Sequence, residues 1–342
     1  MGLFSFTQEL AMDLGTANSI IIQNGKIVLD EPSIVALDSR TEQVKAIGEK
    51  AQQMKGKENS NIRTVRPLRD GVIADFKAAE DMIRGMVKMV NRKQNFLVSP
   101  SLKMVICIPS GSTEVERRAV RDSTEHAGCR DVYMIYEPMA AAMGVGLDVE
   151  APEGHMIVDI GGGTTEIAVI SLGGLVCNKS IRIAGDELTD DIVQYMGQIH
   201  NIKVGERTAE LIKINVGSAL TELDDEEAPE DYVVRGPNRM TSLPMEVPVS
   251  YQEIAHCLDK SITKMETAIL AALEQTPPEL YADIVRNGIH LTGGGALLRG
   301  LAKRFYDKVN IPFHVAEDPL HAVARGTGLA LKNVDNYSFL MR

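Results

Sequence analysis

A glycine-rich turn led by an aspartate occurs twice in this chain, and it constrains the fold more than any other feature. The first turn covers residues 13–19 (Asp-Leu-Gly-Thr-Ala-Asn-Ser), and the second covers residues 159–165 (Asp-Ile-Gly-Gly-Gly-Thr-Thr). Apolar, strand-like segments flank each turn, so the glycines join two strands. In Rossmann and Walker loops the glycines lead from a strand into a helix instead. The sequence therefore predicts two β-hairpins.

The residues of these turns are suited to binding phosphate and a metal ion. Glycines permit positive φ and let backbone N–H groups approach an anion closely. Hydroxyl and amide donors accompany them at Thr16, Asn18, Ser19, Thr164 and Thr165. Asp13 and Asp159 stand at strand ends, and Mg²⁺ typically takes one or two carboxylates while keeping several waters. One such turn is usually only a hairpin, but two facing each other predict a clamp on a triphosphate, with both aspartates on one metal ion.

Two further features indicate a pair of related lobes around a nucleotide. Residues 291–298 place an apolar stretch and three glycines before a helix, which lets a base or ribose approach the backbone. The helix-like segment 137–144, which begins Glu-Pro, recurs in altered form at 318–326, which begins Asp-Pro. Features that recur in the same order favour two related lobes over a short-period solenoid.

The chain as a whole alternates strand-like and helix-like segments, which is typical of the α/β class. Strands are expected within 10–37, 103–109, 132–136 and 156–183, and helices over 78–91, 112–127, 205–223 and 251–275. Ser112 or Thr113 can cap the second of these helices, and Glu116, three residues after Thr113, is the expected capping-box partner. An acidic run at 224–231 is interpreted as a solvated loop.

Composition excludes several classes of protein. The 342 residues carry a formal net charge of −11, whereas nucleic-acid-binding proteins carry a basic footprint. The four cysteines are far apart and the seven histidines form no metal-binding motif, so no zinc knuckle or redox motif is expected. Scattered thiols fit a reducing cytosol. No apolar run is long enough to span a membrane, and the N-terminus lacks the cationic region of a signal peptide.

The three glycine-rich turns and the two helices occur in the order typical of the superfamily of actin, Hsp70 and sugar kinases. Longer stretches resemble the MreB family of bacterial actin-like rod-shape proteins, and the likeness runs from about residue 10 to 335. These stretches are residues 70–76, 115–119, 137–142 and 159–166. The resemblance implies an actin-like α/β fold, in which two lobes, each with a mixed sheet and helices, hold a nucleotide in the central cleft. It implies ATP and Mg²⁺ as cofactors.

The resemblance also implies roles for individual residues. It places the phosphates against Thr16, Ala17, Asn18, Gly161, Gly162, Gly163 and Thr164, and the adenosine between Glu210 and Lys213 on one side and Gly293, Gly294, Gly295, Ala296 and Leu297 on the other. It assigns the attacking water to Glu137 and Thr164. Taken alone, Glu210 and Lys213 are an ordinary surface ion pair, and Glu137 is a residue stabilised by a helix dipole. Tyr136 is a departure, because many relatives carry an acidic residue there.

By the same resemblance, the favoured function is a filament subunit with a slow ATPase coupled to polymerisation. Such a protein is cytoplasmic and peripheral on the inner face of the cell membrane. Its partners are other copies of itself, anionic lipid and membrane proteins of the cell-elongation machinery, and it organises cell-wall synthesis to set rod shape.

Three alternatives stay open. An Hsp70-like chaperone needs a substrate domain after the nucleotide domain, whereas this chain ends at Arg342. A small-molecule kinase needs a carboxylate base aimed at a substrate hydroxyl, and we find no candidate outside the phosphate turns. An actin-like division protein usually has a rearranged small domain.

Two apolar tips are candidates for membrane contact. They are Leu3, Phe4 and Phe6 at the N-terminus, and Phe96 and Leu97 in a polar loop that follows Arg92 and Lys93. Apolar loop residues usually fold back onto the core, and that interpretation stays open. MreB-like proteins are similar in bearing a membrane-inserting loop and sometimes an apolar N-terminus, so we expect assembly-dependent binding to anionic membranes.

The repeat also predicts how the chain divides into lobes. Residues 1–32, 66–144 and 323–342 form the base of lobe I, with 33–65 as its small subdomain, and residues 145–182 and 248–322 form the base of lobe II, with 183–247 as its small subdomain. This division requires the two aspartate-led turns to lie within about 10 Å of each other, the reach of a shared triphosphate and hydrated ion.

Overall fold

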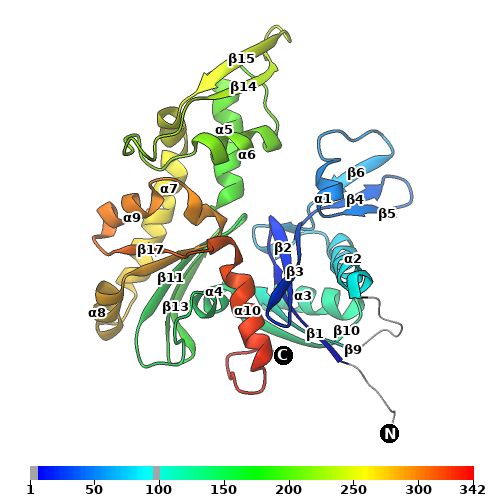
Figure 1. The fold of residues 1–342 in the computed structure, drawn as a ribbon, viewed down its shortest axis with the longest axis vertical. Helices are drawn as coiled ribbons and strands as arrows, with labels where there is room; N and C mark the ends of the chain where they lie inside the picture. The colour runs from blue at the N-terminus through cyan, green and yellow to red at the C-terminus, as the bar shows by residue number, and fades with distance from the viewer. Residues whose placement is uncertain (1–6, 95–100) are drawn as a thin grey trace.

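The computed structural model describes residues 7–94 and 101–342, which form two lobes side by side, lobe I and lobe II (Figure 1). The base of lobe I is a five-stranded sheet in the order β10-β9-β1-β2-β3. Its strands are β1 (Thr7–Leu14), β2 (Asn18–Gln23), β3 (Lys26–Pro32), β9 (Ser101–Ile108) and β10 (Cys129–Tyr136). The central strand β1 pairs antiparallel with β2 and parallel with β9.

The base of lobe II repeats this arrangement in a second five-stranded sheet, β17-β16-β11-β12-β13. Its strands are β11 (His155–Ile160), β12 (Thr165–Ser171), β13 (Gly174–Ile181), β16 (Ile289–Thr292) and β17 (Phe313–Val315). Here β11 pairs antiparallel with β12 and parallel with β16, as β1 does with β2 and β9. Each aspartate-led turn therefore joins two antiparallel strands, as predicted.

Two helices lie between the sheets, α4 (Glu137–Gly144) and α10 (Ala322–Lys332). They contact each other closely, because a Cβ on Gly144 would lie 1.8 Å from the Ala322 carbonyl oxygen and one on Gly326 would lie 1.7 Å from the Ala140 carbonyl oxygen. The second helix starts later than the predicted 318, because residues Pro319–His321 form a short 3₁₀ turn, η2. The repeated glycines thus mark the place where the two helices cross.

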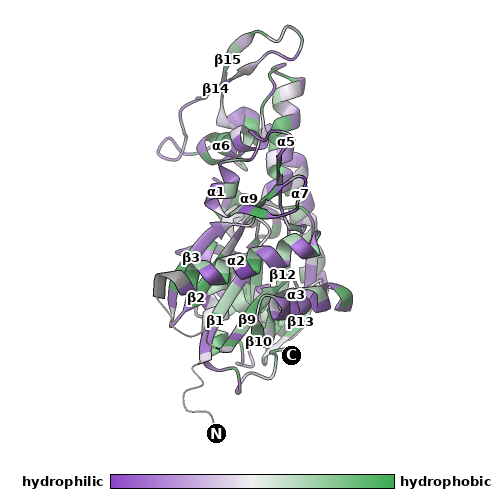
Figure 2. Cartoon of the chain, turned by 90° about the vertical axis from the view of Figure 1, so that its right-hand side faces the viewer, coloured by the Kyte–Doolittle hydropathy of each residue, from purple (hydrophilic) through white to green (hydrophobic). Residues whose placement is uncertain are grey.

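Amphipathic helices cover the outer faces of both sheets. Lobe I has α2 (Phe76–Gln94) and α3 (Glu114–His126), and lobe II has α7 (Tyr251–Glu274), α8 (Pro278–Asn287) and α9 (Leu301–Val309). Figure 2 shows hydrophilic residues along α3, in front of the paler and more hydrophobic strands of the sheet. The predicted capping box of α3 is present, with Thr113 accepting from the Glu116 N–H. No helix of the described ranges is long and apolar enough to cross a membrane.

Each lobe carries a smaller outer piece. Lobe I has α1 (Glu49–Gln52) with β4 (Val35–Asp38), β5 (Val44–Ile47) and β6 (Ile62–Val65), and lobe II has α5 (Gly185–Gln198), α6 (Glu206–Val216), β14 (Tyr232–Pro237) and β15 (Pro244–Val249). A short hairpin, β7 (Leu68–Arg69) and β8 (Val72–Ile73), follows β6. The helix predicted over 205–223 was too long, because Gly217 is extended (φ −65°, ψ 131°) and ends α6. The acidic run at 224–231 is a largely exposed loop, as predicted.

Candidate functional site

The two aspartate-led turns are in direct contact across the lobes. A Cβ placed on Gly162 would lie 2.8 Å from the Ala17 Cβ, and one placed on Gly163 would lie 2.7 Å from the Thr16 Oγ1. These distances leave no room for a side chain, so both positions need glycine. A ligand held by one turn therefore meets the other.

Both turns have paired carbonyl groups and unpaired N–H groups. In the first turn, the carbonyls of Gly15 and Ala17 accept hydrogen bonds from Ser33. In the second turn, the Gly161 carbonyl accepts from the Gly185 N–H and the Gly162 carbonyl accepts from the Asp186 N–H. All four bonds are 2.6–3.1 Å long. Within the described ranges, the N–H groups of Thr16, Ala17, Gly162 and Gly163 have no hydrogen-bond acceptor. Unpaired N–H groups on successive turn residues are the arrangement that binds anions.

Two carboxylates, Asp13 and Asp159, lie at the ends of the central strands β1 and β11. Burial raises the pKa of Asp13 to about 6. Burial, and then the charges of Asp13 and Glu166, raise the pKa of Asp159 to about 7. No lysine or arginine of the described residues forms an ion pair with either carboxylate, and no described set of three metal-ligating side chains exists. Two like charges without a cationic partner, Asp159 buried and Asp13 half-buried, fit Mg²⁺, which takes one or two carboxylates.

These raised pKa values predict a pH-dependent effect of Mg²⁺ on stability. The folded-state pKa of each aspartate exceeds its ordinary value of 3.8, so the stability that its proton contributes is lost as pH rises through about 6 and about 7. If the two carboxylates hold Mg²⁺, the bound ion offsets that loss, because a metal binds the ionised form of its ligands. We expect Mg²⁺ to raise the melting temperature of the nucleotide complex more at pH 8 than at pH 6, as measured by calorimetry.

The matched control for this prediction is Asp159→Asn, which keeps the titration of the nucleotide itself and removes that of one carboxylate. The difference between the two pH values should shrink in this variant. An equal effect of Mg²⁺ at both pH values in the unmodified protein would show that these carboxylates do not bind the metal.

Glu137 is the first residue of α4 and lies close enough to both aspartates to respond to their charge. Burial, and then the charges of Glu166, Asp159 and Asp13, raise the pKa of Glu137 well above its usual range. Its carboxylate makes no hydrogen bond or ion pair with any other described residue. Thr164, the other residue assigned to the attacking water, packs on the turn at Gly71, whose Cβ would lie 2.9 Å from the Thr164 Cγ2. Glu137 thus offers an unpaired carboxylate beside the phosphate-binding turns.

A second buried glutamate, Glu166 on β12, was not predicted as a site residue. Its carboxylate accepts hydrogen bonds from the Ser110 N–H (3.0 Å), the Ser110 hydroxyl and the Ser180 hydroxyl. Ser110 follows β9 of lobe I and Ser180 lies on β13 of lobe II, so Glu166 links the two lobes. The predicted hairpin could have indicated Glu166 as a site residue. Glu166 is the cross-strand partner of Asp159 in the β11–β12 hairpin, so the two side chains lie on the same face of the sheet.

The residues expected around adenosine come from α6 and from the turn after β16. Lys213 forms an ion pair with Glu210 at 2.8 Å and donates to the Gly185 carbonyl, also at 2.8 Å. The second bond ties the pair to the start of α5, so it is more than an isolated surface ion pair. Gly293 has φ +79° and leads into η1 (Gly294–Leu297), in which the Leu297 side chain is exposed.

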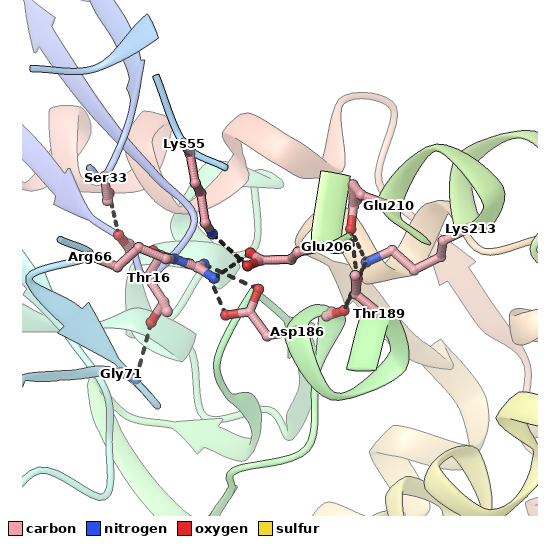
Figure 3. A network of polar contacts seen from close by, with 12 residues as sticks. Thr16, Ser33, Lys55, Arg66, Gly71, Asp186, Thr189, Glu206, Glu210 and Lys213 are labelled. Atoms are coloured by element: carbon pink, nitrogen blue, oxygen red, sulfur yellow. Dashed lines mark hydrogen bonds and ion pairs between the residues drawn. The ribbon is translucent and has the colours of Figure 1, made fainter. Parts of the chain in front are cut away.

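A cluster of four charged side chains, which sequence reasoning missed, joins the two lobes (Figure 3). Arg66 of lobe I binds both carboxylate oxygens of Asp186 at 2.9 and 3.1 Å and Glu206 at 3.2 Å. Lys55 binds Glu206 at 2.5 Å. Arg66 also donates to the Thr16 carbonyl at 3.4 Å, so this cross-lobe cluster reaches the first turn. These partners are 120–151 residues apart, which explains why no local pattern indicated them.

The apolar tips assigned to membrane contact, Leu3, Phe4, Phe6, Phe96 and Leu97, lie outside the described residues.

Comparisons with known proteins agree with the geometry. The MreB/Mbl protein family matches residues 7–338. The cell shape-determining protein MreB of Escherichia coli strain K12 is 45% identical over 339 residues, which cover 96% of this chain and 95% of that protein. MreB5 of Spiroplasma citri bound to AMPPNP has a TM-score of 0.89 at 37% identity, covering 96% of this chain and 97% of that one. The MamK double helical filament, at 18% identity and a TM-score of 0.78, covers 96% of this chain and 99% of its own, and shares the fold. The chain therefore has the actin-like fold and belongs to the MreB/Mbl family.

Proposed function

We propose that this chain is a filament subunit whose assembly is coupled to binding and slow hydrolysis of ATP. The observation that carries the proposal is the contact between two turns with unpaired N–H groups, beside the carboxylates of Asp13 and Asp159. The similar MreB5 binds AMPPNP, an ATP analogue, and MamK, which shares the fold, forms a double helical filament. In this proposal the chain determines cell shape, as the name of the similar E. coli protein says of that protein. It does so on the inner face of the cell membrane, where it organises cell-wall synthesis.

The proposed roles of the residues follow the chemistry of the site. The phosphates are held by Thr16, Ala17, Asn18 and Gly161–Thr164, and the adenosine is flanked by Glu210, Lys213 and Gly293–Leu297. Mg²⁺ is held by Asp13 and Asp159. The attacking water is positioned by Glu137 and Thr164. The lobe bases comprise 1–32, 66–144 and 323–342 for lobe I and 145–182 and 248–322 for lobe II, with 33–65 and 183–247 as the small subdomains. Mg²⁺, when bound, neutralises charge on the β- and γ-phosphates.

In this proposal the protein contributes orientation and electrostatics. The N–H groups of the two turns hold the phosphate oxygens from both lobes, which fixes the γ-phosphate in the cleft. Glu137 accepts a hydrogen bond from a water molecule and aims it at that phosphate. Because Arg66 binds Asp186, Glu206 and the Thr16 carbonyl at once, it holds the lobes together around the nucleotide.

Sedimentation and electron microscopy of the purified protein test the proposal. With Mg²⁺ and ATP the protein should enter the pellet and form filaments, and without nucleotide it should do so less. Release of ADP that depends on an added sugar would identify a kinase instead, and ATP turnover stimulated by unfolded peptide would identify a chaperone. Absence of both polymer and nucleotide binding would contradict the proposal.

Membrane binding is expected to depend on the two apolar tips. Insertion of a Phe or Leu stabilises the bound state by about 1.5–3 kcal/mol, and a nearby Arg or Lys adds about 1 kcal/mol on anionic lipid. These values are marginal for a monomer and large for a filament with many linked copies. Deletion of residues 1–6 together with Phe96→Ser and Leu97→Ser should abolish flotation with anionic liposomes.

The control for this variant is polymerisation in solution, which it should retain. Flotation at the wild-type level would show that these tips do not anchor the filament.

A further inference from the structure

Each of the two aspartates proposed as Mg²⁺ ligands accepts a hydrogen bond from a side chain on the neighbouring parallel strand. The Cys107 Sγ donates to the Asp13 Oδ1 at 3.0 Å. The Thr292 Oγ1 donates to the Asp159 Oδ1 at 2.7 Å. Neither Cys107 nor Thr292 was a candidate site residue by sequence, because each looks like an ordinary strand residue before a turn.

The two donors occupy equivalent places in the repeated sheets. Asp159 is the direct partner of Thr292 in the parallel pairing of β11 with β16. In the parallel pairing of β1 with β9, Met12 is the partner of Ile106, which puts Asp13 and Cys107 next in line. The same strand ends therefore carry the same carboxylate–donor pair in both lobes, with a thiol in lobe I and a hydroxyl in lobe II.

Both donor side chains are shielded from solvent in the folded protein. The Thr292 side chain is fully buried and that of Cys107 is 2% exposed. Both donors bind Oδ1, and no described residue donates to the Oδ2 of either aspartate.

We propose that Cys107 and Thr292 are positioning residues for the metal site, an inference that rests on the proposed function. Each holds one carboxylate oxygen and fixes the side-chain rotamer of its aspartate, which leaves the second oxygen for Mg²⁺ or a metal-bound water. Partners that hydrogen-bond to ligating carboxylates commonly set metal affinity. A thiol is a weaker donor than a hydroxyl, so Asp159 is held more firmly than Asp13.

The test is the Mg²⁺ concentration that half-saturates the metal-dependent tightening of nucleotide binding, measured with a fluorescent ATP analogue. Thr292→Val keeps the shape of the side chain and removes the donor, so it should raise that concentration about tenfold. Thr292→Ser keeps the hydroxyl and should stay near wild type. Nucleotide affinity in excess EDTA should be the same in all three proteins.

The second pair of variants tests the equivalent position in lobe I. Cys107→Ala should raise the half-saturating Mg²⁺ concentration less than Thr292→Val does, by about threefold, because the lost donor is weaker. Cys107→Ser should match the wild type or bind Mg²⁺ more tightly. This pair also keeps the inference testable if Thr292→Val does not fold.

Asp159→Asn separates the positioning role of Thr292 and Cys107 from the metal site itself. If it changes the Mg²⁺ dependence and neither Thr292→Val nor Cys107→Ala does, the positioning role is wrong and the metal site stands. If Asp159→Asn changes nothing, the metal site itself fails and the positioning role with it. A loss of nucleotide affinity that is equal with Mg²⁺ and with EDTA would show that Thr292 and Cys107 only support the fold.

Discussion

Replacement of Glu137 by alanine is expected to slow ATP hydrolysis by about 100-fold or more and to leave ATP affinity almost unchanged. The carboxylate has no partner among the described residues, so its removal breaks no contact that supports the fold or the phosphate turns. A group that orients the attacking water acts mainly in the transition state, and its loss therefore lowers kcat. Single-turnover phosphate release and equilibrium nucleotide binding measure the two effects separately.

Asp13→Ala is the contrasting variant, since it should weaken Mg²⁺-dependent nucleotide binding itself. Glu137→Gln keeps the size of the side chain, and it should be as slow as Glu137→Ala if the carboxylate charge is what matters. Hydrolysis at the wild-type rate in Glu137→Ala would show that another group orients the attacking water. Glu166, whose charge acts directly on Glu137, is then the first residue to examine.

Gly326→Ala is expected to destabilise the protein by about 3 kcal/mol and to lower its melting temperature by about 5 °C or more. The new Cβ would lie 1.7 Å from the Ala140 carbonyl oxygen. This oxygen belongs to the backbone of α4, so no rotamer change relieves the collision and the two helices must move apart. The direction of this stability change is informative, because replacing glycine by alanine in a helix otherwise stabilises the helix by about 1 kcal/mol. Differential scanning calorimetry measures the change.

Gly144→Ala should behave in the same way, because its Cβ would lie 1.8 Å from the Ala322 carbonyl oxygen across the same crossing. Gly174→Ala is the matched control, since the nearest atom to its Cβ would be 3.8 Å away, an ordinary contact. Equal melting temperatures for Gly326→Ala and Gly174→Ala would mean that the helices are not held at this distance.

Much of the fold was predictable because its signals are local. The Thr113–Glu116 capping box starts α3 where the sequence placed it, and the glycines at 161–163 mark a turn between strands. The end of α6 was missed although its signal is also local, because Gly217 follows the helical run directly and glycine commonly ends a helix. Helix propensity alone carried the predicted helix past this point.

Local sequence was enough to predict the two hairpin turns, their leading aspartates Asp13 and Asp159, and the repeat that makes two related lobes. Each of these features lies within a few consecutive residues, where residue type limits φ, hydrogen bonding and periodicity directly. Other contacts arise only when the chain folds: Thr292 and Cys107 donate to the aspartates, Glu166 links the lobes, and Arg66 joins Asp186 and Glu206. These contacts bring together side chains 56–140 residues apart. Their partners are chosen by the register of the strands and by the docking of one lobe on the other, which no local pattern encodes.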